Sequence, residues 1–423
     1  MTDDETPARR WTRMIRPVAV IICGAVLGWF AFAVSADNVL AAKKPAIAVR
    51  LGAGSELAAG IRAADLMLTR RPTPGDIAQA RQLAESALRA SPVNVPAIRA
   101  LGLIATFGGN APMARRLFTY GEGLSRRDLA TQIWLIEDAV QRDNVPGALL
   151  HYDRALRTNV EARALLFPVL ISAAAQPQII RPLGRIIAAR PEWWSAFIAT
   201  MIATPGSSPS SLAYLLQQVR LNPSDEIEGP LSSAALARLV NDREYARAYQ
   251  LYRSLRPVRG QAPAVNDGGF EAAPSLPPFD WIFADEVDLS ASREAGENGF
   301  VLRLRSGRPQ AGGVARQLLV LPAGRYRLSF MAGEVSSNPT SRPAMTLTCA
   351  SENARPFLRA EAPPAQSRGQ TASGLFSVPA TGCPAQWLDI YMAAAPEEQT
   401  IESWIDQISI VPATDAGAGT PGA

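Results

Sequence analysis

The sequence is poor in the residues that most often carry catalysis. His151 is the only histidine, which excludes multi-histidine metal sites and argues against a Ser-His-Asp arrangement. No glycine-rich loop followed by Lys-Ser or Lys-Thr is present, so there is no phosphate-binding loop for a nucleotide. Glycoside hydrolysis by paired carboxylates remains open, with Asp389, Glu402 and Asp406 as candidates. We expect no enzymatic activity.

Lysine is almost absent as well. Lys43 and Lys44 are the only lysines among 42 basic residues, and we interpret this skew toward arginine as codon bias in a GC-rich bacterial genome. It is not a nucleic-acid signal, and we expect no nucleic-acid partner. Apolar residues make up 48% and charged residues 19% of the 423 residues, which is typical of a folded chain with two or three domains.

Only one apolar run is long enough to cross a membrane. Residues 17–36 carry no charge, four arginines precede them and two lysines follow. This pattern predicts a cytoplasmic segment at 1–16 and a single transmembrane anchor at 17–39, with the rest of the chain in the periplasm of a bacterium. The alternative is a signal peptide cleaved after Val34-Ser35-Ala36, which would deliver the chain to the same compartment.

A 34-residue period organises the chain after the anchor. Three sets of residues recur at this spacing: Ala80, Ala114 and Ala148; Ala84, Phe118 and Tyr152; Ala87, Gly121 and Ala155. Such a period predicts stacked helical hairpins, with small residues where helices cross. The three copies resemble the tetratricopeptide repeat family, which implies a concave face that binds a protein segment. We expect five to six hairpins over 55–257, the later ones atypical because Pro168, Pro177 and Pro182 interrupt the register.

The hydrophobic period changes from 3.6 to 2 after a linker at 258–265. Phe300, Leu302 and Leu304 alternate with Val301, Arg303 and Arg305, and residues 326–330 and 345–349 alternate between apolar and polar side chains. Eight or nine strands of this kind predict an antiparallel β-sandwich over 266–412. The remaining residues, 413–423, are rich in Ala, Gly and Thr, and we expect them to be disordered. The fold class is therefore multidomain, with an α-solenoid followed by an all-β domain.

Two motifs bracket this second domain. It opens with Asn266-Asp267-Gly268-Gly269-Phe270-Glu271 and closes with Trp404-Ile405-Asp406-Gln407-Ile408-Ser409-Ile410. The pair resembles the jelly-roll carbohydrate-binding modules of bacterial polysaccharide-active proteins, which implies a jelly roll that binds glycan. The resemblance also implies a structural calcium ion held by Glu271 and Asp406 from neighbouring first and last strands, with Asp267 the only further acid nearby.

Cysteine is scarce, and its placement is informative. Cys23 lies within the anchor, whereas Cys349 and Cys383 both fall in the β domain, where we expect each on a strand. Two cysteines in one exported domain predict a disulfide bond. Two buried free thiols are the alternative.

The segment Gln386–Met392 holds the candidate binding residues. Alternation places Leu388, Ile390 and Met392 in the core, so Trp387, Asp389 and Tyr391 point the other way. Two aromatic rings flanking a carboxylate could stack on a sugar while the carboxylate accepts hydrogen bonds from its hydroxyls. Alternatively, the helical domain or the segment 353–374 covers this face.

Together these features predict an inner-membrane-anchored periplasmic scaffold. It would bind a protein partner through the helical repeats and glycan through the sandwich, in cell-envelope or exopolysaccharide assembly. Two alternatives remain open: an assembly factor whose sandwich binds protein, and a polysaccharide-processing enzyme that uses the sandwich carboxylates.

Overall fold

The computed structural model describes most of the chain after the apolar N-terminal run. The described residues are 25–29, 31–32, 40–41, 43–50, 56–69, 71–257, 263–307, 310–351, 355–395 and 400–413. Among them, no helix combines the length and apolar character that a bilayer crossing requires. The predicted cytoplasmic segment, most of the predicted anchor, residues 258–262 of the linker and the tail after Ala413 lie outside the described residues.

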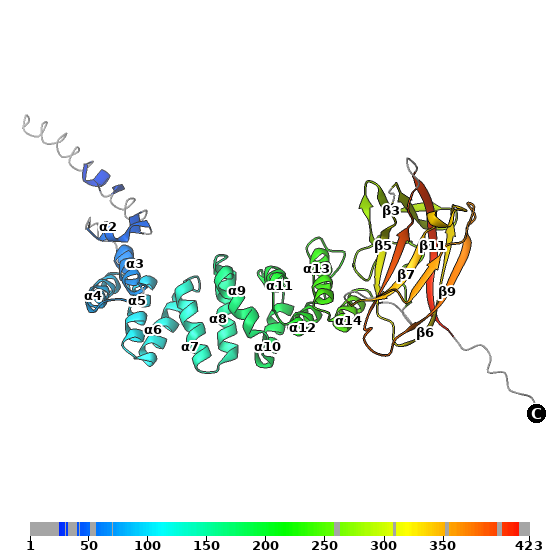
Figure 1. The fold of residues 1–423 in the computed structure, drawn as a ribbon. Coiled ribbons are helices and arrows are strands. Elements are labelled where there is room, and N and C mark those ends of the chain that lie inside the picture. Colours follow the sequence, from blue (N-terminus) through cyan, green and yellow to red (C-terminus); the bar gives the residue numbers. More distant parts are fainter. Residues whose placement is uncertain are drawn as a thin grey trace, which may run out of the picture. The chain divides into compact units, whose positions relative to one another are not determined.

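The chain falls into two compact units, residues 1–168 and 169–423. The first unit is helical (Figure 1). Its helices are α2 (Pro45–Arg50), α3 (Glu56–Met67), α4 (Pro74–Ala90), α5 (Val95–Phe107), α6 (Ala111–Leu124), α7 (Leu129–Gln141) and α8 (Val145–Thr158). Helix α9 (Ala162–Ala173) spans the boundary between the units. Helices α3 and α4, α5 and α6, and α7 and α8 form three successive hairpins.

The 34-residue period reappears in the turns between helices. Asn110 and Asn144 cap α6 and α8, and each side-chain oxygen accepts a hydrogen bond from the backbone N–H three residues later at 3.1 Å. The residues before them, Gly109 and Asp143, have left-handed φ values of 71° and 53°. The same local geometry therefore turns two consecutive hairpins, which explains why the period is visible in the sequence.

The periodic residues lie in the core of the hairpins. Ala80, Ala114 and Ala148 are buried, as are Phe118 and Tyr152. A Cβ atom at Gly102 of α5 would lie 2.8 Å from the Phe118 ring of α6, so only glycine leaves room for this ring. The predicted stack of helical hairpins, with small residues at the crossings, is confirmed.

The second unit begins with five more helices: α10 (Pro177–Ala188), α11 (Trp194–Ala203), α12 (Pro209–Val219), α13 (Glu228–Asn241) and α14 (Tyr245–Leu255). Helices α11 and α12, and α13 and α14, are in contact. Pro168 and Pro182 lie inside α9 and α10 rather than at their ends. These prolines therefore interrupt the sequence period without ending a helix, and only Pro177 opens one.

A two-sheet antiparallel sandwich follows, drawn in green to red in Figure 1. Its strands are β1 (Ile282–Phe283), β2 (Asp285–Glu286), β3 (Leu289–Gly296), β4 (Gly299–Ser306), β5 (Gly312–Leu319), β6 (Gly324–Gly333), β7 (Ala344–Cys349), β8 (Leu358–Glu361), β9 (Gln370–Val378), β10 (Gln386–Met392) and β11 (Ile401–Pro412). A 3₁₀ turn, η1, covers Pro339–Ser341. The sheet orders are β1-β5-β10-β7-β8 and β2-β3-β4-β11-β6-β9.

The strand pairing is that of a jelly roll. β4 pairs with β11, β5 with β10, β6 with β9 and β7 with β8. These nested pairs form one long antiparallel ribbon that folds over to make both sheets. Because the order of pairing is symmetric about the β7–β8 connection, the two strands that end the ribbon, β4 and β11, are neighbours. The predicted antiparallel sandwich and its jelly-roll topology are both present.

The strand alternation predicted from the sequence matches the observed core. Leu302 and Leu304 of β4 are fully buried, as are Leu328 of β6 and Leu347 of β7. Val265, at the end of the predicted linker, already packs into this core. The opening motif differs from the expectation, because residues 266–271 form a turn and not a strand.

A disulfide bond joins Cys349 to Cys383, with Cα atoms 5.1 Å apart. The predicted pairing is therefore confirmed, and free thiols are excluded. Cys349 is the last residue of β7, but Cys383 lies in the connection between β9 and β10 and not on a strand as expected. The bond thus fastens this connection to the neighbouring strand, next to where β10 begins.

A buried carboxylate links α14 to the sandwich. Asp280 is 4% exposed and accepts hydrogen bonds from the Tyr252 hydroxyl at 3.0 Å and from the Arg256 guanidinium at 2.8 Å. Its other oxygen accepts backbone N–H groups of Ser275 and Leu276, each at 2.9 Å. Burial and the Asp280 charge raise the pKa of Tyr252, so this hydroxyl stays protonated and donates. The last helix and the first loop of the sandwich are therefore held by a satisfied buried network.

Candidate functional site

The candidate site lies on β10, near the middle of the five-stranded sheet. Leu388, Ile390 and Met392 are buried between the sheets, each no more than 1% exposed. Trp387 and Tyr391 are half-buried on the opposite, outer face of the sheet. The side-chain directions predicted from alternation are therefore those in the structure.

Arg316 of β5 joins the three predicted residues into one cluster. It is the cross-strand partner of Asp389, and its Nε lies 3.2 Å from Asp389 Oδ1. Its guanidinium carbon lies 3.9 Å from the centre of the Trp387 ring, within the range of a cation–π contact. One face of the Trp387 indole is thus occupied by a cation that also holds the carboxylate.

Asp389 is the most buried charged group of this face, with 13% of its side chain exposed. Burial raises the pKa of its carboxyl, and the nearby Arg316 charge lowers the same pKa by less. At neutral pH the group is an anion held by one guanidinium. Its remaining lone pairs can accept hydrogen bonds from a ligand.

A hollow of about 470 Å³ lies over this part of the sheet. Its lining includes Arg316, Asp389, Tyr391, Thr348 of β7 and Ile282 of β1. Gly313 of β5 faces the Tyr391 ring, and a Cβ there would lie 3.8 Å from the ring. The hollow therefore has two charged groups, two hydroxyls and an aromatic wall, which is suited to binding a polar ligand with apolar faces.

The segment that could have covered this face takes another place. Of residues 353–374, the described part supplies β8, at the edge of the same sheet, and the start of β9 in the other sheet. Helix α14 of the second unit contacts the sandwich near Cys349 instead, where the Tyr245 hydroxyl donates a hydrogen bond to the Ala350 carbonyl. Neither contact occupies the hollow over β10.

The predicted calcium ligands Glu271 and Asp406 lie near each other. The Glu271 charge is one of the causes that raise the pKa of Asp406, after burial. The Asp267 oxygens accept the backbone N–H groups of Glu271 and Ala272 at 2.8 and 3.0 Å, so this carboxylate already holds the opening turn. In the described residues no cluster of three or more acidic, histidine or cysteine side chains could hold a metal ion. Two repelling carboxylates fit a hard cation, but backbone oxygens or water would have to complete its shell.

The three carboxylates considered for glycoside hydrolysis do not come together. Asp389 lies on the outer face of the five-stranded sheet, whereas Glu402 and Asp406 belong to β11 of the other sheet. Glu402 forms an ion pair with Arg305 at 2.8 Å. Hydrolytic pairs need carboxyl groups about 5–10 Å apart on either side of one bond, and two packed sheets separate Asp389 from the others.

His151 lies in the helical unit, away from these groups in the sequence. Its Nδ1 is 2.8 Å from the side-chain oxygen of Gln132, a buried residue of α7. Burial lowers the pKa of His151, and the Arg154 charge lowers it further, so the ring is neutral at pH 7. This geometry is that of a packed, hydrogen-bonded histidine.

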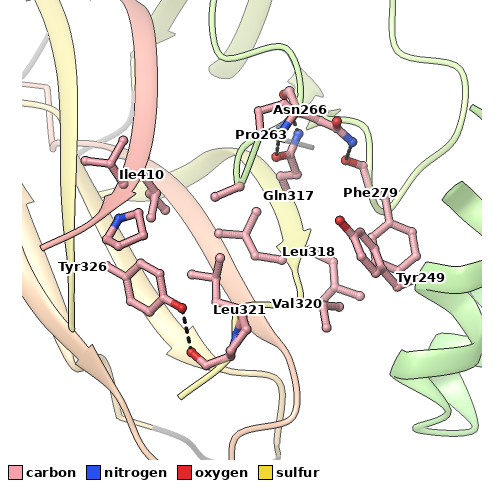
Figure 2. A pocket seen from close by; sticks show the side chains of 15 residues that line it. Tyr249, Pro263, Asn266, Phe279, Gln317, Leu318, Val320, Leu321, Tyr326 and Ile410 are labelled. Carbon is pink, nitrogen blue, oxygen red and sulfur yellow. Dashed lines mark hydrogen bonds between the residues drawn. The ribbon is translucent and has the colours of Figure 1, made fainter. Parts of the chain in front are cut away.

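A second hollow, of about 580 Å³, lies where α14 meets the sandwich (Figure 2). Figure 2 shows Tyr249 of α14 and Phe279 on one side and Leu318, Leu321 and Tyr326 on the other. Two of its polar side chains are engaged within the protein. Gln317 exchanges two hydrogen bonds of 2.9 Å with the Asn266 backbone, and the Tyr326 hydroxyl donates to the Pro322 carbonyl at 2.9 Å. Its lining, as far as the structure describes it, holds no charged side chain to orient a ligand, so we do not consider it the functional site.

Arg316 is the functional residue that sequence reasoning missed. It is the only charged residue in β5, which could have singled it out. Its position opposite Asp389, however, depends on the register between two strands separated by about 70 residues of chain.

No protein-family model matches the chain, and no curated relative matches it. Among solved structures, the chain is similar to one described as "CBM4 structure and function", at 14% identity over 35% of this chain and 99% of that one, with a TM-score of 0.27. It is similar to TmCBM61 in complex with β-1,4-galactotriose, at 13% identity over 36% and 100%, with a TM-score of 0.26. It is also similar to the C-terminal family 22 carbohydrate-binding module of Clostridium thermocellum Xyn10B, at 15% identity over 37% and 99%, with a TM-score of 0.27.

Proposed function

We propose that the outer face of the five-stranded sheet binds glycan. The observation that carries this proposal is the cluster of Trp387, Arg316 and Asp389 at a hollow that Tyr391 also lines. Structural packing alone would not require the buried charge of Asp389, which costs free energy to desolvate.

The chemistry of the cluster matches a neutral sugar. A vicinal diol is both donor and acceptor, so one hydroxyl can accept from Arg316 while its neighbour donates to Asp389. The apolar C–H face of the same ring can rest on Tyr391 or on the free side of Trp387. An acidic sugar fits less well, because its carboxylate would meet the Asp389 anion. We therefore propose neutral polysaccharide as the ligand class.

We further propose that the helical hairpins act as a tetratricopeptide-type scaffold for a protein partner. The three hairpins with their periodic buried residues, and the repeated asparagine caps and left-handed turns of two of them, support this kinship. With the apolar run and its flanking arginines, the whole is an inner-membrane-anchored periplasmic adaptor in envelope or exopolysaccharide assembly. This pathway assignment rests on the combination of modules.

A reporter fused after Pro45 tests the topology. It should be active only when exported, and a cytoplasmic signal would contradict this topology.

A structural calcium ion between Glu271 and Asp406 belongs to the same proposal. A cation there would relieve the repulsion that raises the pKa of Asp406, and it would fasten the opening turn to β11. The two segments already share one backbone contact, from the Ile408 N–H to the Gly268 carbonyl at 2.8 Å. The ion would support the fold and take no part in glycan binding.

Binding, not catalysis, is the proposed activity of the sandwich. The experiment is native affinity electrophoresis of the purified full-length chain in gels that contain galactan, xylan, mixed-linkage β-glucan or polygalacturonate. We expect retardation by at least one neutral polymer and less by polygalacturonate. Retardation by none would favour the alternative in which the sandwich binds protein. Release of reducing ends from a retained polymer would favour the enzyme.

A further inference from the structure

A second tryptophan lies on the other outer face of the sandwich. Trp404 belongs to β11 of the six-stranded sheet, where it alternates with the buried residues Ser403 and Ile405. It therefore points away from the core, and away from the face that carries Trp387. Its cross-strand partners are Arg303 of β4 and Gly333 of β6.

The Trp404 ring packs on two glycines, Gly333 and Gly369, which we call its glycine bed. A Cβ atom at Gly333 would lie 2.2 Å from Trp404 Cε2, and one at Gly369 would lie 2.5 Å from Cη2. Gly369 has a left-handed φ of 71° and needs to be glycine for its backbone. The backbone of Gly333 is not left-handed, so it is the ring that requires glycine there. The indole thus rests directly on the backbone of two segments, which holds it against the sheet.

The other side of this ring is not stacked within the described part of the chain. No aromatic ring and no guanidinium group of these residues packs on the Trp404 indole, whereas Arg316 covers one face of Trp387. The residue is half-buried, as expected for a ring with one face on the sheet and one toward solvent. A rigid, flat aromatic surface of this kind loses little conformational entropy when a ligand stacks on it.

The surroundings of Trp404 are polar. Arg303 is held between Glu294 and Glu334, and Arg305 pairs with Glu402 at 2.8 Å. A protein partner would need an apolar patch of several hundred Å², which an isolated indole among charges does not supply. A sugar ring instead combines an apolar C–H face with a rim of hydroxyls. Those hydroxyls match the carboxylates and guanidinium groups around the ring.

Glu334 gives a second, independent sign. It follows Gly333 directly and has a left-handed φ of 55°. This conformation is unfavourable for a residue with a long side chain, and it occurs mostly at glycine or asparagine. The strain keeps a carboxylate beside Arg303 at the edge of the aromatic surface. A glycine at this position would remove the strain, and it would remove the hydrogen-bonding group too.

We propose that Trp404, on its bed of Gly333 and Gly369, forms a second glycan-binding site that takes a neutral sugar ring, with Glu334 and Arg303 binding its hydroxyls. The site is separate from the one at Trp387, because the two rings lie on opposite outer faces of the sandwich. One chain then holds two polysaccharide strands, and it cross-links them instead of only retaining one.

The test compares four forms of the full-length chain by affinity electrophoresis in the same neutral polysaccharides: wild type, Trp404→Ala, Trp387→Ala with Tyr391→Ala, and all three changes together. Ser409→Ala, on the same face of β11, is the matched control. We expect Trp404→Ala to weaken the binding that remains in the double variant at least about tenfold, the loss of roughly one stacking contact. Ser409→Ala should leave it unchanged.

A second measurement does not require the alanine variant to fold. In the chain labelled with 5-fluorotryptophan, the ¹⁹F resonance that disappears in Trp404→Phe belongs to Trp404. It should shift when xylan or galactan oligosaccharides are added, in the wild type and in the Trp387, Tyr391 double variant alike. A Trp404 resonance that stays fixed while the double variant loses all binding overturns the second site and leaves the first intact. A shift at Trp404 with unchanged binding in the double variant would overturn the first site instead. Failure of every polysaccharide to bind would overturn both.

Discussion

Arg316 places its guanidinium carbon 3.9 Å from the centre of the Trp387 ring while its Nε lies 3.2 Å from Asp389. One side chain from β5 thus fixes both an aromatic ring and a carboxylate of β10. Arg316 is 44% exposed, so part of its guanidinium faces the hollow and remains available to a ligand. The arrangement is pre-organised, because the binding groups hold one another before any sugar arrives.

Replacing Arg316 by methionine should therefore weaken glycan binding about tenfold or more. The change removes a charge-assisted donor, of roughly 1.5–3 kcal/mol, and releases the Trp387 ring. Arg359→Met is the matched control, since Arg359 lies on β8 of the same sheet and pairs only with Glu361 at 3.2 Å among the described residues. Titration calorimetry of both variants with a bound oligosaccharide makes the comparison. Equal affinities for the two variants would remove Arg316 from the site.

Glycan binding should depend on pH through Asp389. Burial raises the pKa of this carboxyl above its ordinary value of 3.8. The anion that accepts sugar hydroxyls is therefore lost at a higher pH than for an exposed aspartate, and affinity should fall as the pH drops through that range.

The effect of Asp389 on the stability of the chain has the opposite sign. Between pH 3.8 and the raised pKa, the folded chain binds more protons than the unfolded chain, so this group's contribution to the unfolding free energy decreases as the pH rises. Asp389→Asn should abolish both trends, and persistence of the pH-dependent affinity in that variant would contradict the assignment.

Breaking the Cys349–Cys383 bond should destabilise the sandwich. The bond closes a loop with a sequence separation of 34 residues, and the chain-entropy estimate for such a loop is about 4 kcal/mol. Cys383→Ser should lower the unfolding free energy of the β domain by an amount of this order, measured in urea. Cys23→Ser, in the N-terminal apolar run, serves as control. A serine variant as stable as the wild type would show that the bond adds nothing to the fold.

Calcium should raise the thermal midpoint of the chain. At a concentration about 100-fold above its dissociation constant, a bound ion stabilises the folded state by about 2.7 kcal/mol. The rise should be reversed by EDTA and should be absent when Glu271→Gln and Asp406→Asn are combined. Magnesium, which demands stricter geometry, is the control ion. A rise that survives in the double variant would place the ion elsewhere.

The periodic features of the fold, the helical repeats and the strand alternation, could be predicted from the sequence. The 34-residue spacing of Ala80, Ala114 and Ala148 predicted the helical hairpins, because each close helix crossing requires a small residue at the equivalent position. Alternation likewise predicted which side chains of β10 are buried. The opening motif was misjudged as a strand, because the left-handed φ values of Asp267 and Phe270, 45° and 56°, are not evident from residue type.

Side-chain contacts that depend on strand register could not be predicted from the sequence. The pairing of Arg316 with Asp389 and of Trp404 with Gly333 joins residues that are about 70 positions apart along the chain. Each depends on a jelly-roll ribbon that brings distant strands together, and a shift of one residue would turn either side chain to the other face. The sequence identifies Trp404 only as the first residue of the closing motif, because its contacts with Gly333 and Gly369 depend on this register.

The most direct test of the account is the affinity of the Trp387→Ala, Tyr391→Ala double variant for a neutral oligosaccharide that the wild type binds. Titration calorimetry on the full-length chain, with Trp404→Ala in both proteins, isolates the site on the five-stranded sheet. We expect a loss of more than about a hundredfold, equivalent to roughly 2.8 kcal/mol for two stacking rings, with a thermal midpoint within about 3 °C of the parent. Unchanged affinity in a folded double variant would contradict it.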